Sequence, residues 1–421
     1  MAKDFNDART ALLTAFERTR QATEALSEPL SAEDQCVQTM PDVSPTKWHR
    51  AHTTWFWETF LLGPNRPGYR VFDEGFCYLF NSYYEQVGER HPRPERGFLT
   101  RPSCAEIGDY RRHVDRAVAD FLSSANDHEI AKTIGIVQLG IAHEQQHQEL
   151  LVTDIKHVLS RHPFGPAAYP APEPGPAGIA ETAFVTFDEG LVEIGHESAE
   201  FAFDNEGPRH RIWLEPFGLA DHPVTNREYA EFIADGGYET ATLWLSDGWA
   251  RIQEDRRRAP LYWRERDGTW FEFTLHGEQE IDPDAPVSHL DFYEANAFAE
   301  WTGYRLPTEA EWEHAASKAG QPGRFLNPGV SAHPAGAVGP GLRQMFGGVW
   351  EWTRSDYAPY PGFRAPEGAV GEYNGKFMCG QYVLRGGSCA TPEGHVRRSY
   401  RNFFPPNAQW QFSGLRLARD V

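Results

Sequence analysis

Apolar side chains recur every three or four residues through roughly the first 160 positions of the chain, which is the spacing of amphipathic helices. Helices are predicted over residues 4–27, 44–62, 103–125 and 128–160. The second of these has Ser44 in position for an N-cap and Pro45 at the first helical position. Four long helices in succession predict a four-helix bundle.

A segment of different character lies between the second and third predicted helices. Residues 76–102, FCYLFNSYYEQVGERHPRPERGFLTRP, are too rich in Pro, Gly and Arg for a helix and too long for a simple turn. Loops of this length are usually functional or disordered. The aromatic side chains of this one favour a functional role.

The pattern changes again at residue 163, where a stretch rich in Pro, Gly and Ala begins. Such a composition is typical of a semi-rigid linker, which we place at residues 163–183. Beyond it, short apolar runs alternate with Gly and Pro and with two helical segments, which predicts a loop-rich α+β domain. The expected multi-domain organisation is therefore an all-α domain at residues 1–162 and an α+β domain at residues 184–421.

Composition and charge narrow the class of protein. No apolar run approaches the roughly 20 residues that span a bilayer, and the N-terminus lacks an apolar signal segment, so we expect a cytoplasmic protein without a membrane partner. The five cysteines are scattered and odd in number, which fits a reducing compartment. A formal net charge of −20 would repel phosphate backbones, so nucleic-acid binding is not expected.

The motif HEQQH places two histidines four positions apart on the last predicted helix. Residues at this spacing lie on one helix face, so His143 and His147 can direct both imidazoles at one metal ion. The alternative is a pair of buried histidines that are hydrogen-bonded to carbonyls or carboxylates. A third ligand would favour the metal.

The earlier helix offers that third histidine in the motif WHRAHTTWFWE. His52 shares a face with Trp48 and Trp55 and is expected to point into the bundle, whereas His49 is expected at the surface. Metal sites in bundles are built from facing helices, and three neutral imidazoles leave coordination positions open for catalysis. Imidazole suits zinc, iron, copper and nickel alike, so these residues do not choose the metal.

Several separated motifs, taken in order, resemble those of the ergothioneine-pathway sulfoxide synthases. They are SPTKWHRAHTTWFWE, FNSYYEQVGERHPRP and HEQQHQE in the first half, and RLPTEAEWEHAA, GGVWEWT, LRGGS and FSGLRLARD in the second. The resemblance covers nearly the whole chain. It implies a DinB-like four-helix bundle followed by a domain similar to the formylglycine-generating enzyme, which has a C-type-lectin-like fold. It also implies that Fe(II) and dioxygen join the sulfur of a thiol to C2 of the imidazole of hercynine, as a sulfoxide.

The resemblance assigns residues in the helical half to that chemistry by position. His52, His143 and His147 match the three iron ligands. Gln146, in the same HEQQH motif, matches a residue that contacts hercynine.

Two aromatic motifs match further parts of the family's site. Tyr83 and Tyr84 resemble the active-site tyrosine pair of the cysteine-using branch, where a phenol can supply a proton or a hydrogen atom. Neighbours on an extended segment point opposite ways, so we expect only one of the two to act. Asn402 and Phe403 match the motif that holds the betaine end of hercynine, since a quaternary ammonium prefers aromatic faces and amide oxygens. The alternative for all four residues is ordinary packing.

Three further residues bear on which sulfur donor the protein binds. Arg90 and Arg93 would suit a donor carboxylate through bidentate contacts, and an exposed basic loop is the alternative. In the branch that uses γ-glutamylcysteine, an aspartate follows the motif matched by Asn402 and Phe403. This chain has Phe404 there, which favours cysteine or another small donor.

The second domain is predicted to shape the substrate site, as one fold can carry different functions. Formylglycine-generating enzymes bind copper with a cysteine pair in the segment after the RGGS turn. Here that segment carries Arg and Ser, and Cys379 and Cys389 lie elsewhere.

Three other functions stay open on the sequence. A selenoneine synthase would join a selenosugar to hercynine with much the same iron site. A zinc or nickel thiol transferase of the DinB type would share the histidines but would not need a second domain. A non-enzymatic, metal-stabilised binding module is the remaining reading, and the tyrosine-bearing loop argues against it.

Overall fold

The computed structural model describes residues 2–178 and 181–421, and the chain divides into two compact units. The first unit comprises residues 1–164 and 367–373, and the second comprises residues 165–366 and 374–421. The predicted linker includes residues 179 and 180, which lie outside the described residues. Nothing in the sequence pattern anticipated that a segment from the second half of the chain would belong to the helical unit.

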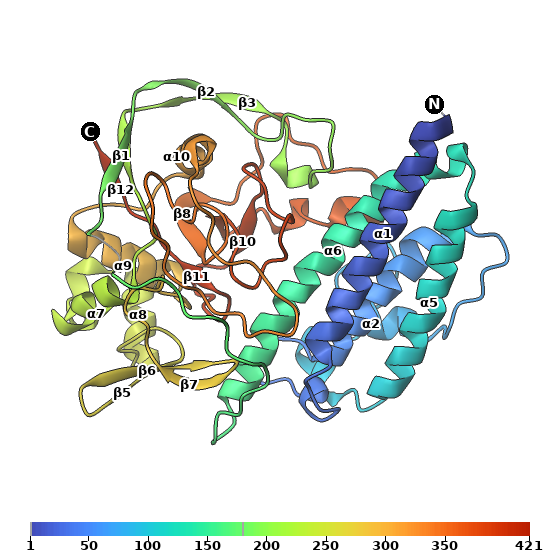
Figure 1. The fold of residues 1–421 in the computed structure, drawn as a ribbon, viewed down its shortest axis with the longest axis horizontal. Coiled ribbons are helices and arrows are strands. Elements are labelled where there is room, and N and C mark those ends of the chain that lie inside the picture. The colour runs from blue at the N-terminus through green and yellow to red at the C-terminus, as the bar shows by residue number, and fades with distance from the viewer. Residues whose placement is uncertain (1, 179–180) are drawn as a thin grey trace. The chain divides into compact units, whose positions relative to one another are not determined.

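Long helices lying side by side make up most of the first unit, as Figure 1 shows. They are α1 (Ala2–Ser27), α2 (Thr46–Phe56), α5 (Cys104–Ser124) and α6 (Asp127–Ser160). Helices α1 and α2 each pack against both α5 and α6. A π-helical segment, Trp57–Leu62, and the short α3, Gly63–Asn65, extend α2. The predicted four-helix bundle is confirmed.

Side-chain caps explain where two of these helices begin. Ser103 caps α5 and Asn126 caps α6, each within a reciprocal capping box. The predicted start of α2 is wrong by one residue, because Pro45 holds the cap position and the helix begins at Thr46. Pro45 has an extended backbone with ψ 143°, so Ser44 lies outside the helix, where its backbone N–H donates to a carboxylate of α6.

The segment between α2 and α5 is more helical than its composition predicts. It contains α4 (Phe76–Phe80) and a 3-10 helix at Arg93–Phe98. These pieces are short because Pro and Gly interrupt them, so the segment remains mostly irregular.

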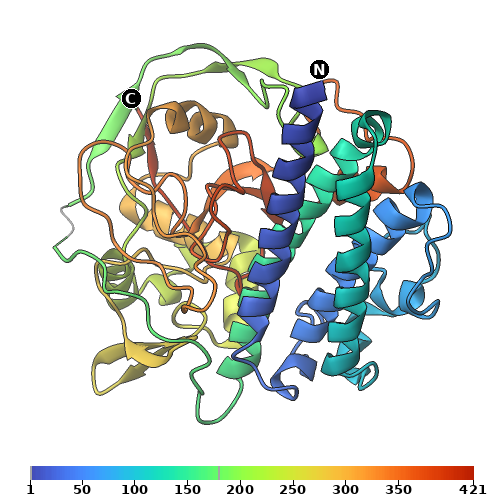
Figure 2. The same cartoon turned by 45° about the vertical axis from the view of Figure 1, so that its right-hand side comes forward.

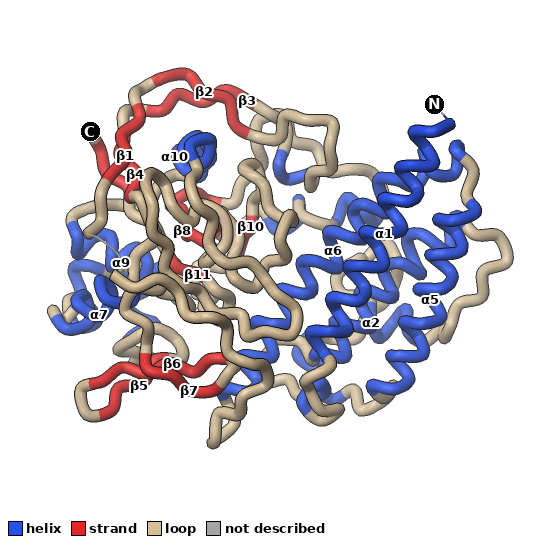
Figure 3. The backbone as a smooth tube through the Cα atoms, viewed as in Figure 1, coloured by secondary structure: helices blue, strands red, loops and turns tan. Residues whose placement is uncertain are grey.

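The second unit is α+β, as predicted, and Figure 3 shows how much of it is loop. Its helices are α7 (Asn226–Ala234), α8 (Ser246–Asp255), α9 (Phe292–Thr302) and α10 (Glu309–Ala315). One sheet has the order β1 (Phe184–Phe187), β4 (Phe217–Ala220), β12 (Ala418–Asp420). A second has the order β10 (Asn402–Phe404), β9 (Tyr382–Arg385), β8 (Trp350–Asp356), β11 (Ser413–Gly414). The others pair β2 (Gly190–Ile194) with β3 (His210–Leu214), and β6 (Thr269–Thr274) with β5 (Trp263–Arg266) and β7 (Gly277–Glu280).

A buried ion cluster holds the start of β10 in place. The Arg401 guanidinium donates to both carboxylate oxygens of Glu309 on α10, at 2.9 and 3.0 Å. Glu309 also accepts from Arg385 on β9 at 2.9 Å. Because the charges are paired and hydrogen-bonded, the cluster can be buried, and it fixes the backbone immediately before Asn402.

Candidate metal centre

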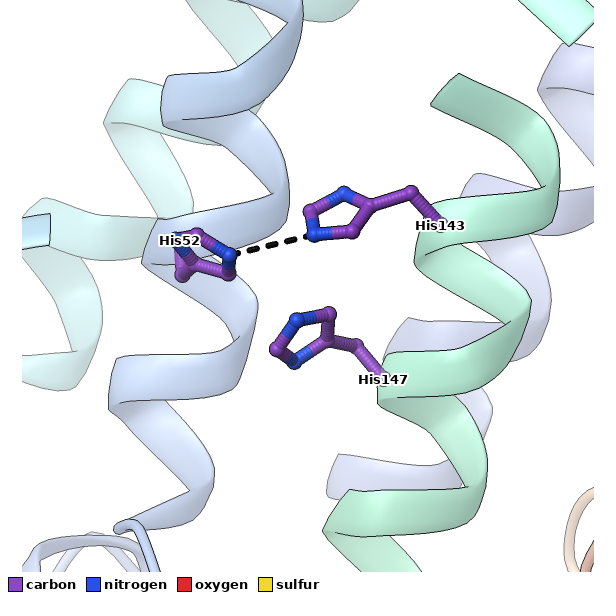
Figure 4. A group of neighbouring side chains, drawn as sticks. All are labelled: His52, His143 and His147. Carbon is purple, nitrogen blue, oxygen red and sulfur yellow. Dashed lines mark hydrogen bonds between the residues drawn. The ribbon is translucent and has the colours of Figure 1, made fainter. Parts of the chain in front are cut away.

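Three histidines from two facing helices point toward one another, as Figure 4 shows. His52 comes from α2, and His143 and His147 come from adjacent turns of α6. One ring nitrogen of each lies within 4.8 Å of the others. The structure therefore brings together the three residues that the sequence singled out as ligands.

The hydrogen bonds of His52 define which nitrogen faces the cluster. Its Nδ1 lies 2.6 Å from the carbonyl oxygen of Phe80, which can only accept, so Nδ1 carries the proton. The lone pair of Nε2 then faces Nε2 of His143 at 3.1 Å. This is close to the spacing of two nitrogens that each bind one ion at about 2.1 Å.

A cation at this point would be bound by the lone pairs of the ring nitrogens that face the cluster. Without one, a proton of His143 must lie between the two Nε2 atoms. Nδ1 of His143 is buried without a hydrogen-bond partner in the described part of the chain, whichever ring nitrogen carries the proton. Three imidazoles without a thiolate match the chemistry of zinc, iron, copper or nickel. The residues present therefore fit a metal ion.

The surroundings keep all three imidazoles neutral, as metal ligands must be. Burial lowers the pKa of His143 to about 3. Burial, with the neighbouring His143, lowers the pKa of His52 well below its usual value. The pKa of His147 is lowered in the same direction by burial and by His52, although the His147 ring retains some contact with solvent.

Aromatic rings wall one side of the cluster. The Trp48 ring stacks on the ring of His52 with 4.6 Å between centroids and 9° between planes. Phe56 packs on His143 with 4.4 Å between ring centroids. The guanidinium of Arg96 covers the other face of this wall, 3.4 Å from the Trp48 ring centroid. Nothing in the motif ERHPRPERG distinguishes Arg96 from the arginines beside it.

His49 is buried, with 3% of its surface exposed, so its predicted surface position is wrong. The prediction assumed that α2 has a solvent face, but every residue from Thr46 to Phe56 is buried. The Nδ1 atom of His49 lies 2.9 Å from Nδ1 of His147, and its Nε2 lies 3.0 Å from Oδ2 of Asp154. His49 therefore belongs to the surroundings of the cluster.

The rings of Tyr83 and Tyr84 stack on one another, 4.6 Å between centroids, so the expectation that they point opposite ways is wrong. The chain turns here because the side chain of Asn81 accepts from the Tyr84 N–H and donates to the carbonyls of Tyr84 and Gly88. Tyr84 is buried, and burial raises its pKa well above the usual value, so its phenol stays protonated.

The tyrosine that lies beside the HEQQH motif comes from the other half of the sequence. Tyr373 donates its hydroxyl to Oε1 of Gln146, and its ring lies edge-on to His143 with 5.8 Å between centroids. The carboxylate of Glu372 accepts from the backbone N–H groups of Glu85 and Gln86 at 3.1 and 3.0 Å. Residues 367–373 are thereby tied to the tyrosine-bearing loop, and Figure 2 gives a second view of this orange-red part of the chain.

Comparison with known families agrees with this arrangement of a helical metal-binding unit and an α+β unit. The model of the DinB superfamily matches residues 15–151, and that of the sulfatase-modifying factor enzyme 1-like domain matches residues 170–330 and 329–421. The chain is 35% identical over 413 residues to the hercynine oxygenase of Mycolicibacterium thermoresistibile, covering 90% of this chain and 88% of that one. The chain belongs to the hercynine oxygenase family. Membership makes it an oxygen-dependent oxidoreductase.

Two further relatives are similar to this hercynine oxygenase family member, one over nearly the whole chain and one over a little more than half of it. The hercynine oxygenase of Mycobacterium tuberculosis is 34% identical over 412 residues, covering 92% of this chain and 93% of that one. The formylglycine-generating enzyme of Streptomyces coelicolor is 28% identical over 310 residues, covering 61% of this chain and 96% of that one. The resemblance inferred from the motifs is confirmed over 90% of the chain or more.

The two arginines predicted for the donor are exposed in this family member. Arg90 forms an ion pair with Glu85 at 2.7 Å, and Arg93 donates to the carbonyl of Asp42. No described hydrogen bond or ion pair connects either to the three histidines. Their role as donor ligands stays a prediction.

The motif predicted for the betaine end of hercynine forms part of strand β10 in the second unit. The Phe403 ring stacks on Tyr357 with 4.0 Å between centroids and 12° between planes, and Phe377 stacks at 5.9 Å. Oδ1 of Asn402 accepts from the backbone N–H of Phe403 at 2.9 Å. The Phe404 ring contacts Trp410 edge-on. Clustered aromatic faces of this kind can bind a quaternary ammonium.

Two other expectations concern partners and metals. No helix among the described residues combines the length and apolarity that crossing a membrane requires. Cys379 is exposed and Cys389 is buried, and the absence of a copper site in the second domain stays a prediction.

Proposed function

We propose that this chain is a non-haem iron(II) sulfoxide synthase that joins the sulfur of a small thiol to C2 of the hercynine imidazole. The observation that carries the proposal is the convergence of three neutral imidazoles beside the hydrogen-bonded pair of Gln146 and Tyr373. The hercynine oxygenases among its relatives support the same substrate.

The proposed reaction balances with dioxygen as the oxidant. The C2–H bond of hercynine and the S–H bond of the thiol break, and a C–S bond and an S–O bond form. Dioxygen accepts four electrons, so that one oxygen atom enters the sulfoxide and the other leaves as water.

The helical unit would bind the metal and orient the imidazole. His52, His143 and His147 would hold iron(II), which when bound supplies coordination positions for both substrates and for dioxygen. The amide of Gln146, held by Tyr373, offers polar atoms beside His143 for the second imidazole nitrogen of hercynine. The aromatic wall formed by Trp48 and Phe56 would exclude water from the opposite side.

The tyrosine pair would supply the proton. Tyr84 is buried and its ring stacks on that of Tyr83, which fixes the position of its phenol. The geometry supports one donor among Tyr83 and Tyr84, because the two rings lie at different depths, Tyr84 buried and Tyr83 half-buried.

We assign the betaine end of hercynine to Asn402 and Phe403 because of their motif and because Phe403 lies in a stack of aromatic rings. Cysteine is the favoured donor, since Phe404 cannot pair with the ammonium group that γ-glutamylcysteine would present. Arg90 and Arg93, which are exposed, are proposed to bind the donor carboxylate.

The test is anaerobic reconstitution with iron(II), followed by exposure to oxygen with hercynine and one donor in each reaction. The donors are cysteine, γ-glutamylcysteine and a selenosugar, and the products are read by mass. A sulfoxide adduct with cysteine supports the proposal, whereas a selenium adduct alone would assign the chain to selenoneine synthesis. No adduct, with one zinc or nickel retained per chain, would favour a thiol transferase.

A further inference from the structure

A chain of hydrogen bonds leads away from His147 to a buried carboxylate. Nδ1 of His147 lies 2.9 Å from Nδ1 of His49, and Nε2 of His49 lies 3.0 Å from Oδ2 of Asp154. His49 and Asp154 are each 3% exposed. His147 and Asp154 are seven positions apart on α6, and His49 on α2 bridges them.

The carboxylate of Asp154, which can only accept, sets the direction of the hydrogen bonds between His147, His49 and Asp154. Oδ2 of Asp154 accepts from the backbone N–H of Ser44 at 2.7 Å, so the carboxylate is engaged as an acceptor and His49 must donate to it through Nε2. The tautomer of His49 that carries its proton on Nε2 offers Nδ1 as an acceptor, to which His147 donates through its own Nδ1. This leaves the lone pair of His147 on Nε2.

The carboxylate itself is held in place by its neighbours. Ser44, which donates to Asp154, also accepts through its hydroxyl from the buried guanidinium of Arg96 at 2.9 Å. Arg96 in turn lies against the Trp48 ring. A buried carboxylate with fixed donors on it is a rigid end point for the chain of hydrogen bonds.

The three histidines of the cluster differ in the hydrogen-bond partner of the Nδ1 atom. A backbone carbonyl, that of Phe80, holds His52, and Nδ1 of His143 has no partner in the described part of the chain. Among the described residues, a chain of hydrogen bonds leads from His147 through His49 to a carboxylate. A carboxylate behind a ligating imidazole fixes its tautomer and raises its basicity.

We propose that His49 and Asp154 are positioning residues for His147. They hold its ring with Nε2 directed at the metal and make it the strongest electron donor of the three ligands. Neither residue touches the metal or a substrate. The inference rests on the proposed metal site, and the test separates the two.

The test uses the full chain and three variants. His49→Phe keeps the ring volume but removes both hydrogen bonds, and Asp154→Asn removes the anionic end point. His395→Phe is the control, because His395 is a buried histidine of the second unit whose Nε2 lies 3.2 Å from the Tyr400 hydroxyl. We expect iron(II) and cobalt(II) to dissociate about 10- to 100-fold more readily from the first two variants and unchanged from the control.

Two further measurements separate positioning from a general effect on the bundle. His49→Gln, whose amide can both accept and donate, should recover part of the lost metal affinity. In the metal-free protein, the ¹⁵N spectrum of the His147 imidazole, assigned by its loss in His147→Ala, should show a proton on Nδ1. His49→Phe should mix the two tautomers.

Equal metal affinity of the wild type, His49→Phe and Asp154→Asn would overturn the inference and leave the proposed function standing. A wild type that binds neither ion would overturn the proposed function. The metal-free spectra would then decide the relay, since a proton on Nε2 of His147 in the wild type contradicts it.

Discussion

Tyr373 donates a hydrogen bond to Gln146, joining two residues that are 227 positions apart in the chain. Gln146 lies within the HEQQH motif of α6, and Tyr373 ends the segment 367–373 that belongs to the helical unit. The polar edge of the cluster is thus assembled from both halves of the sequence.

Replacing Tyr373 by Phe should weaken the binding of hercynine without removing the metal. The variant keeps the ring against His143 but frees the Gln146 amide to rotate, which costs about 1 kcal/mol, or roughly a 5- to 10-fold rise in KM for hercynine. Steady-state kinetics with hercynine varied would measure it. Tyr304→Phe, at an exposed tyrosine of the second unit, is the control. An unchanged KM would show that Gln146 does not need this partner.

His147→Ala should abolish stoichiometric metal binding and turnover while the bundle stays folded. The apolar contacts between α2 and α6 remain, so circular dichroism should match that of the wild type. His128→Ala, at the exposed start of α6, serves as the control. Retention of one iron per chain with full activity would disprove the assignment of the triad.

The tyrosine pair should divide its roles between the two residues. Of Tyr83→Phe and Tyr84→Phe, one should lose about 100-fold or more in kcat, because a positioned proton donor contributes on this scale. The other should change kcat by less than about 10-fold, since stacking survives the loss of one hydroxyl. Single-turnover product formation would measure both. Two variants of wild-type activity would exclude the pair as the proton source.

Glu144 should stabilise the bundle in a pH-dependent way. Burial opposes its charge, but Arg20 and Arg111 lower its pKa to about 2. A carboxyl whose folded pKa lies below its unfolded value stabilises the protein above the unfolded pKa. That contribution is lost as the pH falls from about 4.5 toward 2.

Glu144→Gln should therefore lower the free energy of unfolding by about 3 kcal/mol at pH 7, because two buried guanidinium groups lose their partner. The difference from the wild type should shrink as the pH falls through the same window. Urea unfolding at several pH values would measure it, with Asp120→Asn, an exposed carboxylate, as the control. A difference that does not change with pH would contradict the assigned pKa.

Donor choice should respond to residue 404. Phe404→Asp should raise the ratio of kcat/KM for γ-glutamylcysteine to that for cysteine, since the new carboxylate can pair with the ammonium group of the larger donor. Competition between the two donors, read by product mass, measures this ratio directly. An unchanged ratio would contradict the preference for cysteine.

The sequence by itself determined the four helices, the α+β class of the second half and the shared helix face of His143 and His147. These features are local or periodic, because a helix places residues four apart on one face whatever surrounds it. The motifs in their order also identified the family.

Tertiary structure alone decided what stands around the three histidines. His49 is buried because α2 is enclosed on every side, and Tyr83 and Tyr84 stack because Asn81 turns the chain beneath them. Tyr373 reaches α6 through contacts between segments far apart in the sequence. Hydrogen-bond partners and burial depend on the packing of distant segments, and no periodicity within one segment records them.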